Sequence, residues 1–257
     1  MKLVNVSGGK NSTAMLLLML EKNLITDEDV ILYIDPTIDF EENKRFIKDL
    51  DRKIRKEYGF KITTIRSDKP FFWYVFNKPI VRGERKGERG YGLPTCKRYR
   101  RWCCNVLKKK VTWKFIKENG FEDVTQYIGF TVEETHRLQK LKESAKESFG
   151  IDTKAPLIEW GLTNKDTFEL CEREGVLNPL YRYFNNFGCR FCPCYSIPQW
   201  RTLYIHFPKY FKQALKAEEK ALRLYGTQLN SHYTLAELKE RFEREIEAKK
   251  TVQMKLF

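Results

Sequence analysis

Short apolar runs alternate with longer amphipathic segments in the first half of the chain. Residues 3–6 and 29–35 are short and apolar, which predicts two buried strands, and residues 61–66 alternate as a third strand. Helices are predicted between these strands. The first is an apolar stretch at 14–20, and the second runs from 40 to 58, with apolar residues at helical spacing. Strands that alternate with helices in this way are typical of a parallel α/β sheet with right-handed crossovers.

The second half of the chain is less regular and mostly helical. A fourth strand is predicted at 124–130, and helices are predicted at 163–174, from 198, at 208–225 and at 234–250. After the third predicted strand, residues 67–96 break the alternating pattern. We expect the aromatic cluster 71–74 to pack in a core. The charged, glycine-rich run 82–92 is expected to form a mobile loop. The fold class that we expect is a doubly wound, Rossmann-like parallel sheet in a domain at 1–185, followed by a helical, cysteine-bearing part at 186–257.

The turn between the first strand and the first helix has the composition of a phosphate-binding loop. It reads Ser7-Gly8-Gly9-Lys10-Asn11-Ser12-Thr13. Two glycines let the backbone approach an anion, the helix N-terminus directs N–H groups at it, and Lys10 adds a positive charge. The glycine spacing is not that of a Walker-A loop. An ordinary glycine turn is the alternative explanation.

A carboxylate follows the second predicted strand at the same edge of the sheet. Parallel sheets bind ligands at the carboxyl ends of their strands, where both the glycine loop and Asp35 fall. Asp35 is therefore a candidate contact for a ribose, a base or Mg²⁺. Capping of the helix that follows explains it equally well.

Composition indicates a globular protein with an anionic partner. The 257 residues are 42% hydrophobic and carry a formal net charge of +14. Such an excess favours nucleotides, RNA or a sulfated or phosphorylated small molecule, although solvated lysines explain part of it. No apolar run approaches a membrane span and the N-terminus lacks the features of a signal peptide, so we expect a cytoplasmic protein, with an oligomer left open.

Seven cysteines in such a chain favour metal or redox chemistry over disulfides. They are an adjacent pair, a Cys-x-x-Cys pair, two flanking residues and one residue inside a predicted helix: Cys103 and Cys104, Cys189 and Cys192, Cys96 and Cys194, and Cys171. Adjacent cysteines suit a tetrahedral zinc ion poorly, whereas a [4Fe-4S] cluster offers separate iron corners, so we favour the cluster. Cys171 is expected to be a core residue.

At these residues the chain resembles the phosphoadenosine-phosphosulfate and adenylyl-sulfate reductase family of the PP-loop superfamily. The loop is similar to the family's Ser-Gly-Gly-x-Asp-Ser, with Asn11 in place of the acidic residue. Residues 129–137, 156–160 and 178–181 with 188–189 resemble further family motifs in the family's order. The four cysteines Cys103, Cys104, Cys189 and Cys192 resemble the ligands of its iron–sulfur branch.

The resemblance implies an adenine nucleotide held by Ser7 to Thr13, Asp35, Gly129 and Arg137, and a cluster on those four cysteines, with Cys96 and Cys194 as alternates. Two departures matter. Thr131 stands where the family has an arginine, and no cysteine follows Cys194, whereas the reductases use a nucleophilic cysteine in their C-terminal tail. Reduction by that route would need Cys194 or Cys96 as the nucleophile.

Three functions remain open. The first is ATP-dependent sulfur transfer with Mg²⁺, in which Lys10 and the loop N–H groups stabilise the pyrophosphate leaving group and an open iron carries the sulfur. The second is a sulfonucleotide reductase that releases sulfite from adenylyl sulfate or its 3′-phosphorylated form. The third is a nucleotide- or RNA-binding iron–sulfur protein without turnover. The acceptor, the sulfur or electron donor and the choice between ATP and a sulfonucleotide are not fixed by the sequence.

Overall fold

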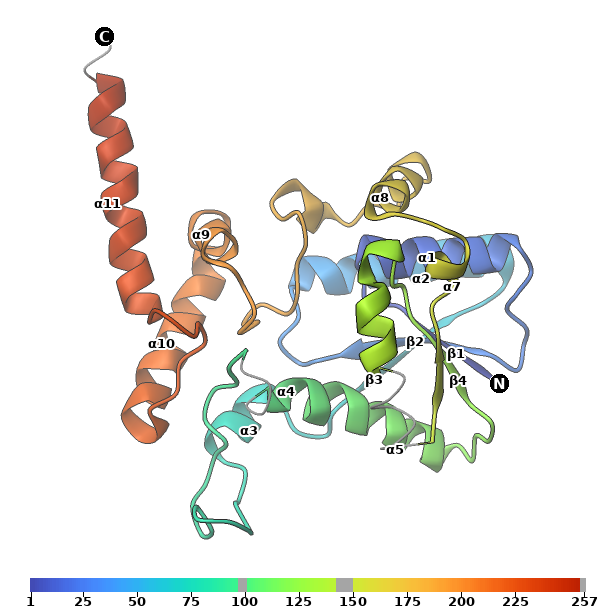
Figure 1. Ribbon diagram of the computed structural model, residues 1–257, viewed down its shortest axis with the longest axis horizontal. Coiled ribbons are helices and arrows are strands. Elements are labelled where there is room, and N and C mark those ends of the chain that lie inside the picture. The colour runs from blue at the N-terminus through green and yellow to red at the C-terminus, as the bar shows by residue number, and fades with distance from the viewer. Residues whose placement is uncertain (97–100, 142–149, 255–257) are drawn as a thin grey trace. The chain divides into compact units, whose positions relative to one another are not determined.

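A computed structural model describes residues 1–96, 101–141 and 150–254 of the chain (Figure 1). The chain divides into two compact units, residues 1–67 with 107–182, and residues 68–106 with 183–257. The sequence predicts domains at 1–185 and 186–257. The structure groups the segment 68–106 with the C-terminal residues, because the chain leaves the first unit after its third strand and returns to it later.

The first unit is built on a five-stranded, all-parallel sheet of order β3-β2-β1-β4-β5. Its strands are β1 (Lys2–Asn5), β2 (Val30–Asp35), β3 (Ile62–Arg66), β4 (Thr125–Tyr127) and β5 (Asp152–Lys154). The chain winds from β1 towards β3 and then resumes on the other side of β1 with β4. The sheet therefore has its topological switch point between β1 and β4, where such folds bind ligands.

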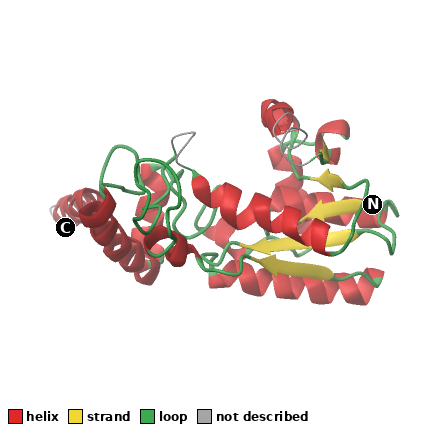
Figure 2. Cartoon of the chain, turned by 90° about the horizontal axis from the view of Figure 1, so that it is seen from below, coloured by secondary structure: helices red, strands yellow, loops and turns green. Residues whose placement is uncertain are grey.

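Helices cover both faces of this sheet (Figures 1 and 2). The first unit contains α1 (Lys10–Glu21), α2 (Glu41–Tyr58), α5 (Lys110–Glu118), α7 (Pro156–Glu159) and α8 (Asn164–Arg173), with short helical turns η2 (Val132–Glu134) and η3 (Pro179–Arg182). Alternate strand residues face opposite sides: Val4 and Ile31 pack with α1 and α2, whereas Leu3 and Leu32 pack with Ile116 of α5. The prediction of a doubly wound parallel sheet is confirmed.

The second unit is helical and rich in aromatic residues. It contains α3 (Phe71–Phe76), α4 (Trp102–Cys104), α9 (Ile197–His206), α10 (Pro208–Tyr225) and α11 (Leu235–Met254), and η1 (Asn105–Lys109) joins α4 to α5. Phe71, Phe191, Trp200 and Phe242 are almost completely buried. Phe71 stacks on Trp102 with ring centroids 5.4 Å apart, so the aromatic cluster 71–74 contributes to a core, as the sequence predicts.

Several elements differ from the sequence prediction. The glycine-rich run 82–92, expected to be mobile, is anchored to α3, because the N–H groups of Tyr91 and Gly92 donate to the carbonyls of Tyr74 and Val75 at 2.9 and 3.1 Å. Strand β5 is not predicted, since its three residues give no apolar pattern. The fourth strand ends at Tyr127, and the chain leaves the sheet after Ile128, whose N–H still donates to the carbonyl of Lys154 at 3.0 Å. Within the described residues, no helix is long and apolar enough to cross a membrane.

Cys171 supplies a test of the first unit's core. Its side chain is completely buried, its thiol donates to the carbonyl of Lys10 at 3.3 Å, and burial raises its pKa to about 12. Since the thiolate is the reactive form, we expect iodoacetamide at pH 8 to leave Cys171 unmodified in the native protein and to alkylate it readily in guanidinium. Peptide mass mapping measures both rates. Equal rates in the two conditions would contradict this packing.

Candidate nucleotide-binding site

The glycine loop joins the end of β1 to the start of α1 at the carboxyl edge of the sheet. Gly8 has φ +82°, and a Cβ built on it would lie 2.0 Å from Oδ1 of Asn43. Only glycine fits here without displacing a buried side chain. The loop is thus held in a tight conformation directly against α2, which carries Asn43.

Two buried amides hold the loop carbonyls. Nδ2 of Asn43 donates to the carbonyl of Ser7 at 3.1 Å, and Nδ2 of Asn178 donates to the carbonyl of Gly8 at 3.0 Å. Asn178 also donates to Oδ1 of Asn43 at 2.7 Å, which couples the two amides. Asn43 donates further to Asp39 at 2.6 Å, and burial raises the pKa of that carboxyl. The loop carbonyls therefore point into the protein.

Two of the loop N–H groups are left for another partner. The N–H of Lys10 donates to the hydroxyl of Tyr181 at 2.8 Å, but the structure records no acceptor for the N–H groups of Gly8 and Asn11 among the described residues. Burial raises the pKa of Tyr181 to about 12, so this hydroxyl stays neutral. Unsatisfied N–H groups at a helix N-terminus are an anion-binding arrangement.

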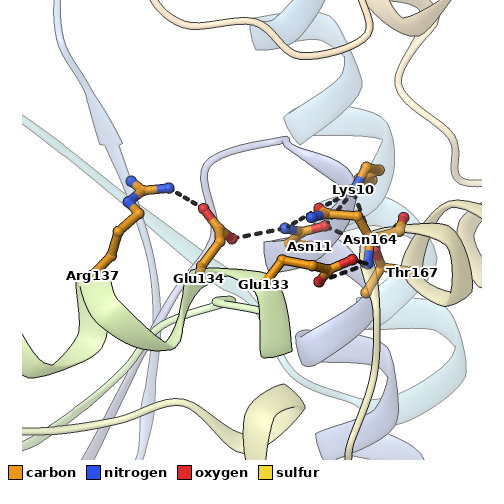
Figure 3. A network of polar contacts seen from close by, with 7 residues as sticks. All are labelled: Lys10, Asn11, Glu133, Glu134, Arg137, Asn164 and Thr167. Atoms are coloured by element: carbon orange, nitrogen blue, oxygen red, sulfur yellow. Dashed lines mark hydrogen bonds and ion pairs between the residues drawn. The ribbon is translucent and has the colours of Figure 1, made fainter.

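Lys10 lies in a polar network that joins the loop to α8 (Figure 3). Its ammonium donates to Oδ1 of Asn11 and to Oδ1 of Asn164, both at 2.6 Å, and to the hydroxyl of Thr167 at 3.3 Å. Burial lowers the pKa of Lys10, although Glu134 and Glu133 oppose that shift. The three hydrogen bonds hold the ammonium of Lys10 in one place beside the loop.

Asn11, which replaces the acidic residue of the motif, uses both sides of its amide. Its Oδ1 accepts from Lys10 and from the hydroxyl of Thr167 at 2.7 Å, and its Nδ2 donates to Asn164 at 3.0 Å and to Glu134 at 3.1 Å. An aspartate carboxylate at this position would offer Glu134 no hydrogen-bond donor. The neighbouring glutamate thus gives a physical reason for an amide in place of the acid.

The segment after β4 packs directly on the loop. A Cβ on Gly129 would lie 2.6 Å from the backbone nitrogen of Ser12, so this glycine permits close contact with the first turn of α1. Beyond it, Arg137 pairs with Glu134, and its guanidinium carbon lies 4.6 Å from the centre of the Phe130 ring. Thr131, where the family has an arginine, is completely buried.

The remaining predicted nucleotide contacts have structural roles of their own. Oδ1 of Asp35 accepts from the N–H of Thr37 at 2.8 Å, and its other oxygen lies 3.8 Å from the ammonium of Lys44. The hydroxyl of Ser12 donates to the carbonyl of Gly9 at 3.0 Å and accepts from the N–H of Ser7 at 3.1 Å. The Thr13 side chain is buried. The structure therefore places Gly129 against the loop Ser7–Thr13 and links Arg137 to Asn11 through Glu134, whereas Asp35 lies in the turn after β2.

Sequence reasoning missed the residues that support the loop. They are the two amides beneath it, the tyrosine at its N–H group and the α8 residues that bind Lys10: Asn43, Asn178, Tyr181, Asn164 and Thr167. A signal existed for Asn178 and Tyr181, because residues 178–181 form one of the family motifs. Asn43 and Thr167 lie inside amphipathic helices and give no local signal.

Six of the seven cysteines belong to the second unit. Cys194 interacts with both Cys192 and Cys96, and the contact with Cys192 and burial raise the pKa of Cys194. The guanidinium of Arg101 interacts electrostatically with Cys194, Cys104, Cys192 and Cys103. In the residues that the structure describes, no three Cys, His, Asp or Glu side chains are grouped to hold a metal ion.

A glycine loop at the switch point of a parallel α/β sheet is an arrangement typical of α/β proteins that bind nucleotides. Residues 2–195 match the phosphoadenosine phosphosulfate reductase domain family, and the chain belongs to that family. Members of the family are enzymes.

The chain is similar to three further proteins. It is 30% identical over 232 residues to an uncharacterized protein of Methanocaldococcus jannaschii, a match that spans 89% of this chain and 42% of that protein's length. A phosphoadenylyl-sulfate reductase from Candida auris, in a phosphate complex, has 13% identity, TM-score 0.44, and coverage of 73% of this chain and 80% of its own. The match to the U34-tRNA thiolase NcsA from Methanococcus maripaludis, with its [4Fe-4S] cluster, has 15% identity and a TM-score of 0.45. It covers 96% of this chain and 72% of the thiolase chain.

The Asn11–Glu134 contact gives the site's first test. We expect Asn11→Asp to destabilise the protein by about 1–3 kcal/mol, because a hydrogen bond to a charged group becomes a contact between two carboxylates. Thermal unfolding measures the loss. In the double variant Asn11→Asp/Glu134→Gln an amide again faces a carboxylate, so most of the stability should return. Additive losses in the double variant would show that the two side chains do not interact.

Proposed function

We propose that the protein is an ATP-dependent enzyme of sulfur transfer that activates an acceptor by adenylation and holds a [4Fe-4S] cluster. The observation that carries the nucleotide part is the loop, whose carbonyls are taken by Asn43 and Asn178 while N–H groups of Gly8 and Asn11 lack a recorded acceptor within the described residues. That arrangement favours a phosphate chain over any uncharged ligand.

The proposed first step is nucleophilic attack by an acceptor oxygen on the α-phosphorus of ATP. The bond from that phosphorus to the bridging oxygen breaks, pyrophosphate leaves, and the acceptor carries AMP. Loop N–H groups and the fixed charge of Lys10 stabilise the negative charge that accumulates on the leaving group. Sulfide from a donor then displaces AMP from the acceptor, and its sulfur takes the place of the oxygen.

Other residues of the first unit complete this step. We assign phosphate or ribose contacts to Ser7, Ser12 and Arg137. Gly129 has no side chain and so leaves room for the loop. Asp35, at the carboxyl end of β2, is the carboxylate proposed to bind Mg²⁺, and its ion pair with Lys44 at 3.8 Å would then open.

The cysteines of the second unit suit an iron–sulfur cluster in donor chemistry. Cysteine thiolates are the usual ligands of such clusters, and six cysteines lie in one unit, where Arg101 interacts electrostatically with four of them. Cys103, Cys104, Cys189 and Cys192 would hold the cluster, with Cys96 and Cys194 as alternates. When bound, it would supply an iron position for inorganic sulfur.

The nucleotide site is tested by pyrophosphate release from ATP and Mg²⁺. We expect Lys10→Ala to reduce both ATP affinity and release by about tenfold or more, since the charge beside the loop is lost. Lys56→Ala, on the exposed end of α2, is the matched control and should behave as the wild type. Unfolding temperatures of both variants show whether loss of the α8 contacts, rather than of the charge, explains the change.

Other outcomes of the same assay would point elsewhere. Sulfite formed from adenylyl sulfate and a thiol, without pyrophosphate from ATP, would identify a sulfonucleotide reductase. Nucleotide binding without turnover of either substrate would identify a binding protein. Equal ATP affinity of Lys10→Ala and wild type would mean that the loop is only a turn.

The cluster is tested by anaerobic iron and sulfide analysis. We expect Cys189→Ser to lose iron and visible absorbance, because one thiolate ligand is removed. Cys171→Ser is the matched control: this residue is buried in the other unit and should keep the full iron content. Unchanged iron in Cys189→Ser would remove Cys189 from the ligand set.

A further inference from the structure

The second unit contains a pocket that the proposed chemistry does not use. Its volume is about 630 Å³, and it is lined by the anchored run 82–92, by α4 and by the C-terminal end of α10. Three aromatic residues form its walls: Tyr91, Trp102 and Tyr225. The size is within the usual range for small-ligand sites.

Two glycines allow these walls to come together. A Cβ on Gly90 would lie 2.3 Å from the hydroxyl of Tyr225, and one on Gly92 would lie 2.7 Å from the hydroxyl of Thr227. Both glycines have positive φ values, +84° and +74°. The N–H of Leu93 donates to Thr227 at 2.9 Å, which fixes the run against the end of α10. The shape of the pocket thus depends on the close approach of the backbone at Gly90 and Gly92 to Tyr225 and Thr227.

The aromatic walls are held in defined orientations. The ring nitrogen of Trp102 donates to the carbonyl of Gly92 at 3.2 Å, and its ring contacts Tyr91 edge to face at 5.5 Å. The hydroxyl of Tyr225 donates to the carbonyl of Phe76 at 3.3 Å. Rings fixed in this way offer flat surfaces at little conformational cost, which suits a planar ligand.

Arg85 adds a further flat surface. Its guanidinium carbon lies 5.3 Å from the centre of the Tyr225 ring, while the group pairs with Glu88 at 2.7 Å and donates to the carbonyl of Gly90 at 3.0 Å. Its charge is therefore already matched by a carboxylate. A guanidinium in this state serves better as a stacking plane than as a phosphate ligand.

The charge of the chain is concentrated in this unit. Residues 68–106 and 183–257 contain 23 Lys and Arg against 10 Asp and Glu, a net charge of +13, whereas the first unit contains 25 against 24. On the run beside the pocket, Arg82, Lys86 and Arg89 are exposed, as are Lys220 and Arg223 of α10. An aromatic-lined pocket with exposed basic residues on two of the segments that line it, in a unit of net positive charge, suits a base on a phosphate backbone.

We propose that this pocket binds an unpaired nucleobase of single-stranded nucleic acid, stacked among Tyr225, Trp102 and Arg85, while lysines and arginines of the second unit bind the phosphates. The proposal goes beyond the proposed function, since nucleic-acid binding here needs neither ATP nor turnover. A single strand fits better than a duplex, because a paired base has no free face to offer the rings.

The test uses an oligonucleotide of about 12 nucleotides with one fluorescent 2-aminopurine at its centre, without ATP. Wild-type protein should quench the fluorescence, and Tyr225→Leu should weaken binding about 5- to 150-fold and abolish the quenching, because a stacking ring is lost. Tyr233→Leu, at an exposed tyrosine of the same unit outside the pocket, is the matched control and should bind as the wild type.

Separate arms distinguish the source of the base. RNA and DNA strands of equal sequence, the matching duplex and the free mononucleotide are compared. Binding of either single strand with the Tyr225 effect supports the proposal, and the stronger strand identifies the partner. Quenching of the free mononucleotide alone, duplex binding that depends equally on Tyr225, or equal losses in Tyr225→Leu and Tyr233→Leu would overturn it.

Discussion

The first unit depends on a pair of buried amides beneath the glycine loop. Asn43 donates to the carbonyl of Ser7, Asn178 donates to the carbonyl of Gly8, and Asn178 also donates to Oδ1 of Asn43. A buried carbonyl without a partner would cost about 1–3 kcal/mol, so these bonds fix the direction in which each peptide group faces. The same bonds determine that loop N–H groups face away from the core, and the capacity for anions follows from that.

This arrangement explains why some of the site could be predicted and some could not. The loop is local: two glycines, a lysine and a helix start lie within seven consecutive residues, and a periodic sequence before and after them predicts the parallel sheet. Asn43 has no such signal, because an asparagine within an amphipathic helix can be predicted only as one of its polar positions. Its role depends on where β1 and α2 meet, which only the tertiary fold determines.

The division of the chain into units shows the same limit. Residues 68–106 follow β3 without a linker-like composition, and the sequence gives no reason to group them with residues beyond 183. The grouping nonetheless brings Cys96, Cys103 and Cys104 into the same unit as Cys189, Cys192 and Cys194. Their spacing and the family resemblance predict the cysteines as a ligand set, and the fold brings six of them, distant in the chain, into one unit.

The distribution of charge separates two kinds of anion binding. In the first unit acidic and basic residues nearly cancel, so attraction to phosphate there must come from local N–H groups and the fixed ammonium of Lys10. Such contacts act over a few ångströms and are only weakly screened by salt. The second unit has a net charge of +13, which acts at longer range and weakens steeply as ionic strength rises. Binding of a mononucleotide and of a longer polyanion to this chain should therefore respond differently to salt, because the two rest on different physical interactions.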